Sequence, residues 1–377
     1  MLEITEVRMT MIFSRSLRGP QANLLRVGLA RGYSSKPLVQ HVTSVDTPHE
    51  SIEVARFREL AFDAGVPLLL KASHDGPATA SMPAMEKWFQ PVSDGQGSPA
   101  ADTVSSYFQD FAMAYLPYEL MYPQKREGGN ELVGQFMSFL QSGSVQSGRA
   151  DTAEARLEQH LASILRQKIT EAPPGLGRPF LDPNRYQQLL RFHAPLALLI
   201  AALRHNAQRK GSSRLRQLYI AQCSLADLPR ELSEDLPTPR LVREAGNGDI
   251  YASSVWLGLE PTYTPLHRDP NPNLFVQLRS SKTVRLLPPH EGRAVFREVQ
   301  TALGRTSGSS RIRGEEMMQG RERELLHQAV WTAPAAPLRE AELGPGDALF
   351  IPKGWWHSVR SRSDDGQLNG SVNWWFR

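Results

Sequence analysis

The chain has 377 residues, of which 40% are hydrophobic and 22% are charged. These proportions are ordinary for a soluble globular enzyme, and the length allows two domains or one large domain with an extension. No apolar run approaches the roughly 18 residues that a membrane-spanning helix needs. The single cysteine, Cys223, excludes an internal disulfide framework and a multi-cysteine zinc site.

Positive charge is concentrated at the N-terminal end. The net charge is +4, and residues 1–33 contribute +3 of it, because five arginines there face only Glu3 and Glu6. The remaining residues therefore carry about +1. That excess is too small to indicate a nucleic-acid-binding surface.

The N-terminal segment has the composition of a targeting sequence. No acidic residue occurs between Glu6 and Asp46, and the intervening residues are rich in arginine and serine. Arg31 in "RGYSS" also resembles the cleavage site of a matrix protease. We therefore predict a mitochondrial transit peptide over residues 1–36 and a location in the matrix. A disordered basic tail is the alternative, and a start at Met9 or Met11 would remove both glutamates.

Residues 37–208 are predicted to form a mainly helical region. Apolar residues recur at helical spacing over 51–65, 102–116, 151–169 and 184–208. The run "VPLLL" after the first of these segments indicates a short buried strand. The segments 72–100 and 126–150 are rich in small and turn-forming residues, so we expect them to be connections. No catalytic motif occurs in this region.

From about residue 209 the pattern changes to short strands separated by turns. The strand-like runs are "RQLYIAQ", "DIYASSVWLGL", "NLFVQLR", "KTVRLLPP", "DALFIP" and "SVNWWFR". This spacing predicts a mainly β domain over 209–377, a double-stranded β-helix of the cupin or jelly-roll type. A charged and mostly helical insertion, 290–342, interrupts the strands.

Three residues in the strand-rich part are candidate metal ligands. His267 and Asp269 are two residues apart, so in an extended strand their side chains point to the same face. His357 follows a turn, a strand and a second turn, in "PGDALFIPKGWWHSV". Two histidines and one carboxylate form the facial triad that binds Fe(II). Catalytic zinc uses the same ligand types, but the HExxH helix of zinc proteases is absent from the sequence.

These motifs resemble the JmjC (cupin-like) 2-oxoglutarate-dependent oxygenases. The resemblance rests on "TPLHRDPNPNLFVQLRSSKTVRLLPP" and "LGPGDALFIPKGWWHSV", and it favours the small JmjC-only protein hydroxylases. It implies that His267, Asp269 and His357 bind iron. It also implies that the distal carboxylate of 2-oxoglutarate is bound by Lys282, Tyr219 and Thr264, with Asn273 and Asn373 nearby. Trp256 and Trp375 match positions that form a substrate wall in relatives, although strand tryptophans are often core residues.

The resemblance implies an Fe(II)- and 2-oxoglutarate-dependent dioxygenase that uses O2 to hydroxylate a protein side chain and releases succinate and CO2. By strand parity Lys282 shares a face with Val284 and Leu286, and a buried ammonium there needs an anion. The alternative from the residues alone is a solvated lysine in the turn "RSSK". Three alternatives remain open from sequence. They are a catalytically silent metal-binding cupin, a tRNA-modifying oxygenase and a metal hydrolase.

Overall fold

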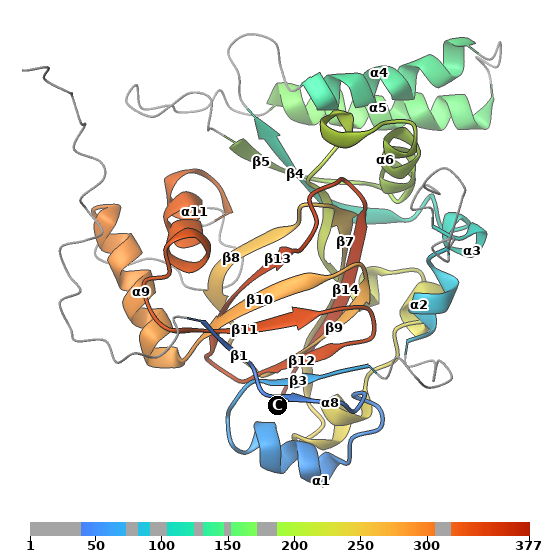
Figure 1. Cartoon of the computed structure of the whole chain (residues 1–377). Coiled ribbons are helices and arrows are strands. Elements are labelled where there is room, and N and C mark those ends of the chain that lie inside the picture. The colour runs from blue at the N-terminus through green and yellow to red at the C-terminus, as the bar shows by residue number, and fades with distance from the viewer. Residues whose placement is uncertain are drawn as a thin grey trace, which may run out of the picture. The chain divides into compact units, whose positions relative to one another are not determined.

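Two β-sheets packed face to face form the centre of the protein (Figure 1). The computed structural model describes residues 39–72, 82–90, 104–123, 131–146, 152–171, 187–305 and 318–377. These residues all belong to one compact unit. The predicted transit peptide over 1–36 lies outside the described residues. None of the described helices combines the length and the apolar character that a membrane crossing requires.

The smaller sheet has five strands in the described part of the chain. In order across the sheet they are β1 (Val39–His41), β11 (Leu338–Leu343), β10 (Lys282–Leu287), β13 (Trp356–Ser361) and β8 (Tyr263–Arg268). The side chains of β10 alternate between two environments, as the period of two requires. Val284 and Leu286 face the larger sheet, whereas Leu287 belongs to the apolar cluster on the outer face.

The larger sheet has nine described strands and supplies the opposite wall. In order they are β2 (Ser44–Val45), β3 (Leu68–Leu70), β12 (Ala348–Ile351), β9 (Asn273–Arg279), β14 (Leu368–Phe376), β7 (Ile250–Leu259), β6 (Leu218–Ser224), β4 (Tyr115–Pro123) and β5 (Gln187–Pro195). The predicted double-sheet jelly roll is thereby confirmed. The space between the sheets is filled by apolar side chains of both, among them Phe275, Val284 and Leu349.

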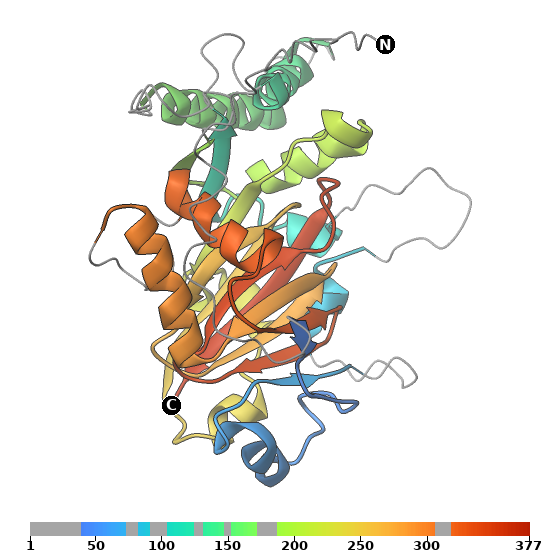
Figure 2. The same cartoon turned by 60° about the vertical axis from the view of Figure 1, so that its left-hand side comes forward.

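Helices cover the outer faces of both sheets (Figure 2). Over the smaller sheet lie α9 (Pro289–Ala302), α11 (Gly320–His327) and the π-helical turn Gln328–Thr332, which belong to the predicted helical insertion 290–342. Its last residues, from Leu338, form the strand β11 instead, and residues 306–317 lie outside the described part of the chain. Beside β5 lie α4 (Glu131–Gln146), α5 (Ala153–Glu171) and α6 (Ala197–Ala207). The shorter helices are α1 (Val54–Phe57) with its π-helical continuation Arg58–Phe62, α2 (Pro83–Lys87), α3 (Ser106–Gln109), α7 (Arg230–Glu234) and α8 (Arg240–Glu244), and 3₁₀ turns occur at Gly211–Ser213 and Leu225–Asp227.

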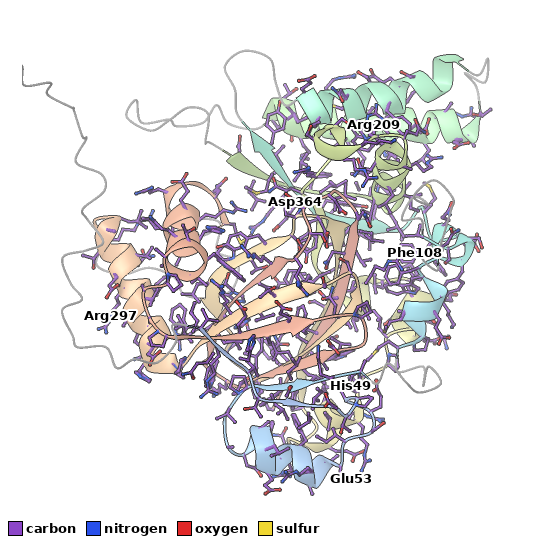
Figure 3. The ribbon with its side chains drawn as sticks, in the orientation of Figure 1. His49, Glu53, Phe108, Arg209, Arg297 and Asp364 are labelled. Carbon is purple, nitrogen blue, oxygen red and sulfur yellow. The ribbon has the colours of Figure 1, made fainter. Side chains whose placement is uncertain are left out.

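Apolar side chains gather between the layers, and most charged ones lie outside them (Figure 3). Phe108 of α3, for example, belongs to the core that fills the space between the larger sheet and its helices. Glu53, Arg297 and Asp364 are exposed, and Glu53 and Arg297 lie at the edge of the molecule in the same view. This separation is what burial of apolar area drives.

The region 37–208 is less helical than the sequence predicts, because it also supplies β1 to β5. The helix expected over 184–208 begins only at Ala197, and residues 187–195 form an edge strand instead. In that strand the buried Leu190, Phe192 and Ala194 alternate with the exposed Arg191 and His193. The local period is therefore two, and pairing with β4 satisfies the backbone.

Two further expectations for this region are corrected. The helix expected over 102–116 is limited to Ser106–Gln109, since the chain is extended from Tyr115 onward. The connection expected over 126–150 contains the helix α4. Its buried residues Val133, Phe136 and Leu140 recur at helical spacing and pack into the core with α5 and α6. Glycine and serine in this segment mask that periodicity in the sequence.

Candidate metal centre

The three predicted metal ligands meet between the two sheets. His267 of β8 and His357 of β13 are direct partners in the antiparallel register, and their ring centroids lie 4.2 Å apart. Asp269 follows the last residue of β8. Nε2 of His267 lies 3.9 Å from Oδ1 of Asp269, and Nε2 of His357 lies 3.6 Å from Oδ2. One ligand atom from each residue falls within 4.8 Å of the others, and all three side chains are buried.

Hydrogen bonds orient both imidazoles toward the aspartate. Nδ1 of His267 donates to the carbonyl of Pro265 at 2.8 Å, and Nδ1 of His357 faces the carbonyl of Trp355 at 3.3 Å. Because a carbonyl only accepts, the proton resides on Nδ1 and the lone pair on Nε2. Burial, aided by His357 and opposed by Asp269, lowers the pKa of His267 to about 4. The ring is therefore neutral near pH 7, as a metal ligand must be.

Asp269 keeps one oxygen available for an ion. Its Oδ2 accepts hydrogen bonds from Nε1 of Trp375 at 2.7 Å and from Nδ2 of Asn273 at 3.0 Å. Its Oδ1 is buried without a hydrogen-bond partner. A buried carboxylate oxygen without a partner carries a desolvation cost that a cation would offset. Two neutral imidazole nitrogens and this oxygen fit a divalent ion such as Fe(II) or zinc.

The predicted residues Asn273, Asn373, Trp256 and Trp375 support the aspartate. Trp256 Nε1 donates to Oδ1 of Asn373 at 2.7 Å, and Asn373 Nδ2 donates to Oδ1 of Asn273 at 3.2 Å. Asn273 then donates to Asp269. Both tryptophans also line the cavity at the ligands. Their ring N–H groups thus serve this network, in addition to any role as a wall for substrate.

Lys282, the first residue of β10, is buried in the same cavity with 2% of its surface exposed. Its Nζ donates to Oγ of Ser371 at 2.6 Å and to the hydroxyl of Tyr219 at 3.3 Å. Within the described residues, no carboxylate lies within salt-bridge distance of this ammonium. Burial lowers the pKa of Lys282 to about 7, against the opposite influence of Glu260. The arrangement leaves a cation ready for an anionic ligand.

The cavity brings all ten predicted site residues together. It is lined by Tyr219, Trp256, Thr264, His267, Asp269, Asn273, Phe275, Lys282, His357, Val359, Asn373 and Trp375. Ser371 was not among the predicted site residues. It lies two residues before Asn373, so its side chain is expected on the same face of the strand. The residues at the mouth, which no motif marks, were not predicted either.

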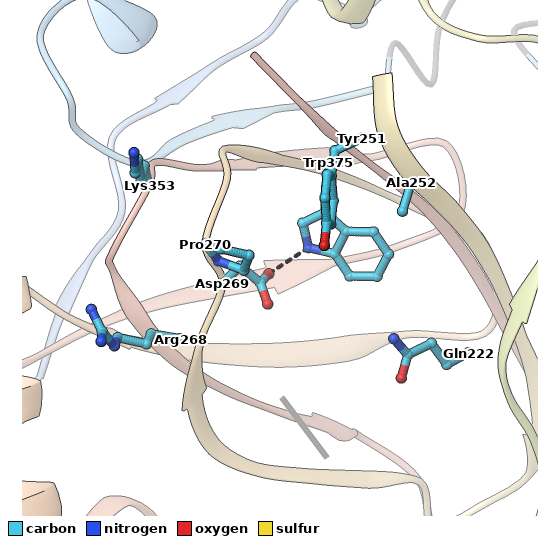
Figure 4. Close-up of a pocket in the computed structure, with 8 residues that line it drawn as sticks. All are labelled: Gln222, Tyr251, Ala252, Arg268, Asp269, Pro270, Lys353 and Trp375. Carbon is cyan, nitrogen blue, oxygen red and sulfur yellow. Dashed lines mark hydrogen bonds between the residues drawn. The ribbon is translucent and has the colours of Figure 1, made fainter. Parts of the chain in front are cut away.

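That mouth is a second cavity of about 690 Å³ (Figure 4). It shares Asp269 and Trp375 with the inner cavity. Its other lining residues are Gln222, Tyr251, Ala252, Arg268, Pro270 and Lys353. Asp269 therefore lies where the inner cavity, called the chamber below, meets the mouth, and an ion bound there would be accessible from both.

Comparison with known proteins agrees with this geometry. Residues 132–377 match the family model described as "Cupin-like domain". The chain is 28% identical over 206 residues to "Lysine-specific demethylase JMJ30" of Arabidopsis thaliana, covering 54% of this chain and 42% of that protein. It is 30% identical over 159 residues to "Lysine-specific demethylase 8" of Danio rerio, covering 42% and 36%.

A third relative is "JmjC domain-containing protein F" of Dictyostelium discoideum, at 26% identity over 172 residues, which covers 42% of this chain and 35% of that protein. The match thus spans less than half the length of each of these three relatives. The family model, by contrast, covers more than half of this chain. This chain therefore belongs to the cupin-like domain family, of the JmjC type.

Proposed function

We propose that this chain is an Fe(II)- and 2-oxoglutarate-dependent oxygenase that hydroxylates a protein side chain and releases succinate and CO2. One observation carries the proposal. A buried carboxylate oxygen of Asp269 and the buried ammonium of Lys282 both lack a charged partner, and both line one cavity. A metal ion for the first and a carboxylate for the second would satisfy both groups at once.

The residues of the chamber would divide the work. His267, Asp269 and His357 would hold the iron and leave its remaining coordination positions open. Lys282, with Tyr219 and Ser371, would bind the distal carboxylate of 2-oxoglutarate, and Thr264 lines the same cavity. The buried walls would exclude water from the reacting groups. When bound, the metal and cosubstrate supply the activation of O2 that hydroxylation of a C–H bond requires.

The relatives named as lysine-specific demethylases raise a second outcome of the same chemistry. Hydroxylation of an N-methyl carbon gives an unstable product that loses the methyl group, whereas hydroxylation of another side-chain carbon gives a stable alcohol. We propose the stable alcohol for this chain, on its resemblance to the JmjC-only hydroxylases. Mass spectrometry of proteins incubated with the enzyme separates the two, since one gains an oxygen atom and the other loses a methyl group.

The decisive experiment measures binding of 2-oxoglutarate to the iron-loaded protein without oxygen. The cosubstrate should raise the melting temperature by mass action. Lys282→Met should remove most of that shift and weaken 2-oxoglutarate binding about tenfold to over a hundredfold, since a charge-assisted hydrogen bond contributes roughly 1.5–3 kcal/mol. Iron binding should stay nearly unchanged, because the lysine contacts no metal ligand.

Lys210→Met is the matched control, because Lys210 is exposed and does not line the chamber. It should bind 2-oxoglutarate as the parent chain does. An unchanged affinity in Lys282→Met would reject the assignment of the lysine to the cosubstrate. The catalytically silent cupin would then be the better description.

We also propose that the protein acts in the mitochondrial matrix, on the composition of residues 1–36. A reporter fused to residues 1–40 should enter mitochondria and be trimmed near Tyr33. Diffuse cytosolic reporter from every candidate start codon would contradict this address.

A further inference from the structure

The mouth of the metal centre continues into a second groove. This groove, of about 580 Å³, shares Gln222, Ala252 and Trp375 with the mouth. Its other lining residues include Glu119, Arg191 and Ser254. The other lining residues belong to β4, β5, β6 and β7, so the groove runs from Asp269 toward the edge of the larger sheet. Either cavity alone would hold a small molecule. Their continuity fits an extended chain.

A β-bulge places Gln222 where the two grooves meet. The register between β6 and β7 shifts between Ile220 and Cys223, and Gln222 adopts a left-handed backbone with φ of 53°. Residues other than glycine rarely adopt this conformation, and bulges beside sites commonly redirect a side chain. The side chain of Gln222 is exposed and lines both grooves. Its amide offers a donor and an acceptor, as a peptide backbone requires.

The charges along the groove favour an anionic occupant. Arg268 and Lys353 are both exposed and line the mouth on one side of Asp269, with Gln222 on the other (Figure 4). Asp269, a metal ligand, is the one carboxylate among the described residues that line the mouth. In the second groove Glu119 is engaged by Arg191 at 3.1 Å. A cationic side chain would therefore meet like charge at the mouth, and an anionic one would be attracted.

We propose, on the basis of the function proposed above, that this groove binds an extended acidic polypeptide segment as the substrate. Gln222 contacts its main chain, and Arg268 and Lys353 attract carboxylates beside the residue that reacts. The two cations, Arg268 and Lys353, can pair with one or two carboxylates of a bound segment. Nucleic acids usually engage many more basic residues, since several phosphates are neutralised together. The exposed ring of Tyr251, with 56% of its surface accessible, adds an apolar contact at the same mouth.

The test measures peptide binding without turnover. Three fluorescent pools of random peptides, equal in length, are enriched in Asp and Glu, in Lys and Arg, or in neutral polar residues. Fluorescence polarisation follows their binding to the full chain loaded with Fe(II) and 2-oxoglutarate without oxygen. The acidic pool should bind at least about tenfold more tightly than the basic pool at low salt, and added salt should reduce the difference.

Four variants identify the residues responsible. Arg268→Glu with Lys353→Glu should abolish or invert the preference for the acidic pool. Arg166→Glu with Lys210→Glu, which changes the net charge equally at exposed positions away from both grooves, should keep it. Gln222→Gly, which suits the left-handed backbone, should weaken all pools alike by several-fold. Arg268→Gln with Lys353→Gln serves if the double charge reversal fails to fold.

Several results would overturn the proposal. They are equal binding of the three pools, a preference that survives in the Arg268/Lys353 variants, no binding of any pool, or tighter binding of a single-stranded RNA of the same length. The 2-oxoglutarate-induced melting shift, measured on the same samples, tests the proposed function separately. A normal shift with no acidic preference rejects only the substrate class. An acidic preference without a shift rejects only the oxygenase.

Discussion

Two buried carboxylates, Asp269 and Asp347, have different surroundings. Asp269 belongs to the metal chamber, whereas Asp347 belongs to a structural contact with Lys71, Ala72 and Gly344 that we call the joint. Asp347, in the turn before β12, accepts hydrogen bonds from Lys71 Nζ and from the backbone N–H groups of Ala72 and Gly344. Asp269 accepts hydrogen bonds through Oδ2, and its buried Oδ1 has no hydrogen-bond partner. The first carboxylate is satisfied by the chain and ties β3 to the turn before β12. The second is complete only with a ligand.

Two lysines repeat the contrast. Lys71 lies 2.6 Å from Asp347, so the joint neutralises its own charge. Lys282 is buried with hydroxyl partners and, in the described part of the chain, with no carboxylate at salt-bridge distance. The two charged groups of the joint therefore pair with each other, whereas Asp269 and Lys282 accept from or donate to neutral groups only. The presence or absence of an oppositely charged partner therefore distinguishes residues that stabilise the fold from residues that would bind ligands.

The largest expected effect comes from Asp269→Asn. It replaces the oxygen donor of the triad with a neutral amide, so metal affinity should fall by more than about a hundredfold and hydroxylation should be abolished. The metal-free protein should unfold at the same or a higher denaturant concentration, because an unsatisfied buried charge is removed. Metal titration and urea unfolding measure the two effects. Normal 2-oxoglutarate turnover in this variant would refute the triad.

Asp347→Asn should show the opposite pattern. The substitution breaks an ion pair and disturbs two backbone hydrogen bonds, so the free energy of unfolding should fall by about 2–4 kcal/mol. Metal affinity should remain that of the parent chain. A loss of metal affinity as large as that in Asp269→Asn would mean that the two carboxylates do not have separate roles.

Trp375→Phe tests whether the support of Asp269 matters to the ion. Removing the N–H donor to Oδ2 should lower metal affinity by about tenfold to a hundredfold, as expected for groups that orient a ligand. Trp374→Phe is the matched control, because Trp374 lies on the other face of β14 in the apolar core and its Nε1 has no hydrogen-bond partner. Equal metal affinities in the two variants would show that Trp375 only packs.

Within any one pH unit, the smallest expected effect on stability is a pH dependence that originates at Lys282. Burial lowers the pKa of this lysine from its usual value of 10.5 to about 7. Between those pH values the unfolded chain binds more protons than the folded one, so the free energy of unfolding of the cosubstrate-free protein should rise with pH. The slope is at most about 1.4 kcal/mol per pH unit. Lys282→Met should remove it.

Cosubstrate binding should change with pH in the opposite direction. A carboxylate is attracted to the protonated lysine, so 2-oxoglutarate affinity should fall as pH rises above about 7. Calorimetric titrations of the parent chain and of Lys282→Met at several pH values measure this. A 2-oxoglutarate affinity that stays constant up to pH 9 in the parent chain would place the bound carboxylate elsewhere.

Local pattern was sufficient for most strands after residue 209 and for the candidate metal ligands. His267 and Asp269 stand at the end of one strand and His357 at the start of another, and the period of two directs them to one side. The alternation placed Lys282 on the same face as Val284 and Leu286, and the resemblance favoured a buried lysine over a solvated one. The structure shows that Lys282 is buried. The face on which each of these side chains lies depends on neighbours within a few residues. It can therefore be predicted from one sequence.

Other features depended on pairing between distant segments. Residues 187–195 read as the start of a helix, yet they form β5 because β4 offers a partner edge. The hydrogen bonds from Trp256 through Asn373 and Asn273 to Asp269 join three strands, and no spacing in the chain predicts them. Ser371 shares the strand face of Asn373 by its spacing, but only the packing of the two sheets brings it to Lys282.

The sequence by itself determined which residues can bind a metal and a carboxylate, because those chemistries belong to the side chains. Only the tertiary structure decided which of their polar atoms stay without a partner. Oδ1 of Asp269 is left open because Trp375 and Asn273 both reach Oδ2, and Gln222 reaches the mouth because β6 bulges against β7. The hydrogen-bond partners come from strands that are distant in sequence. Which polar atoms of the site keep no partner is therefore determined only when the two sheets pack together.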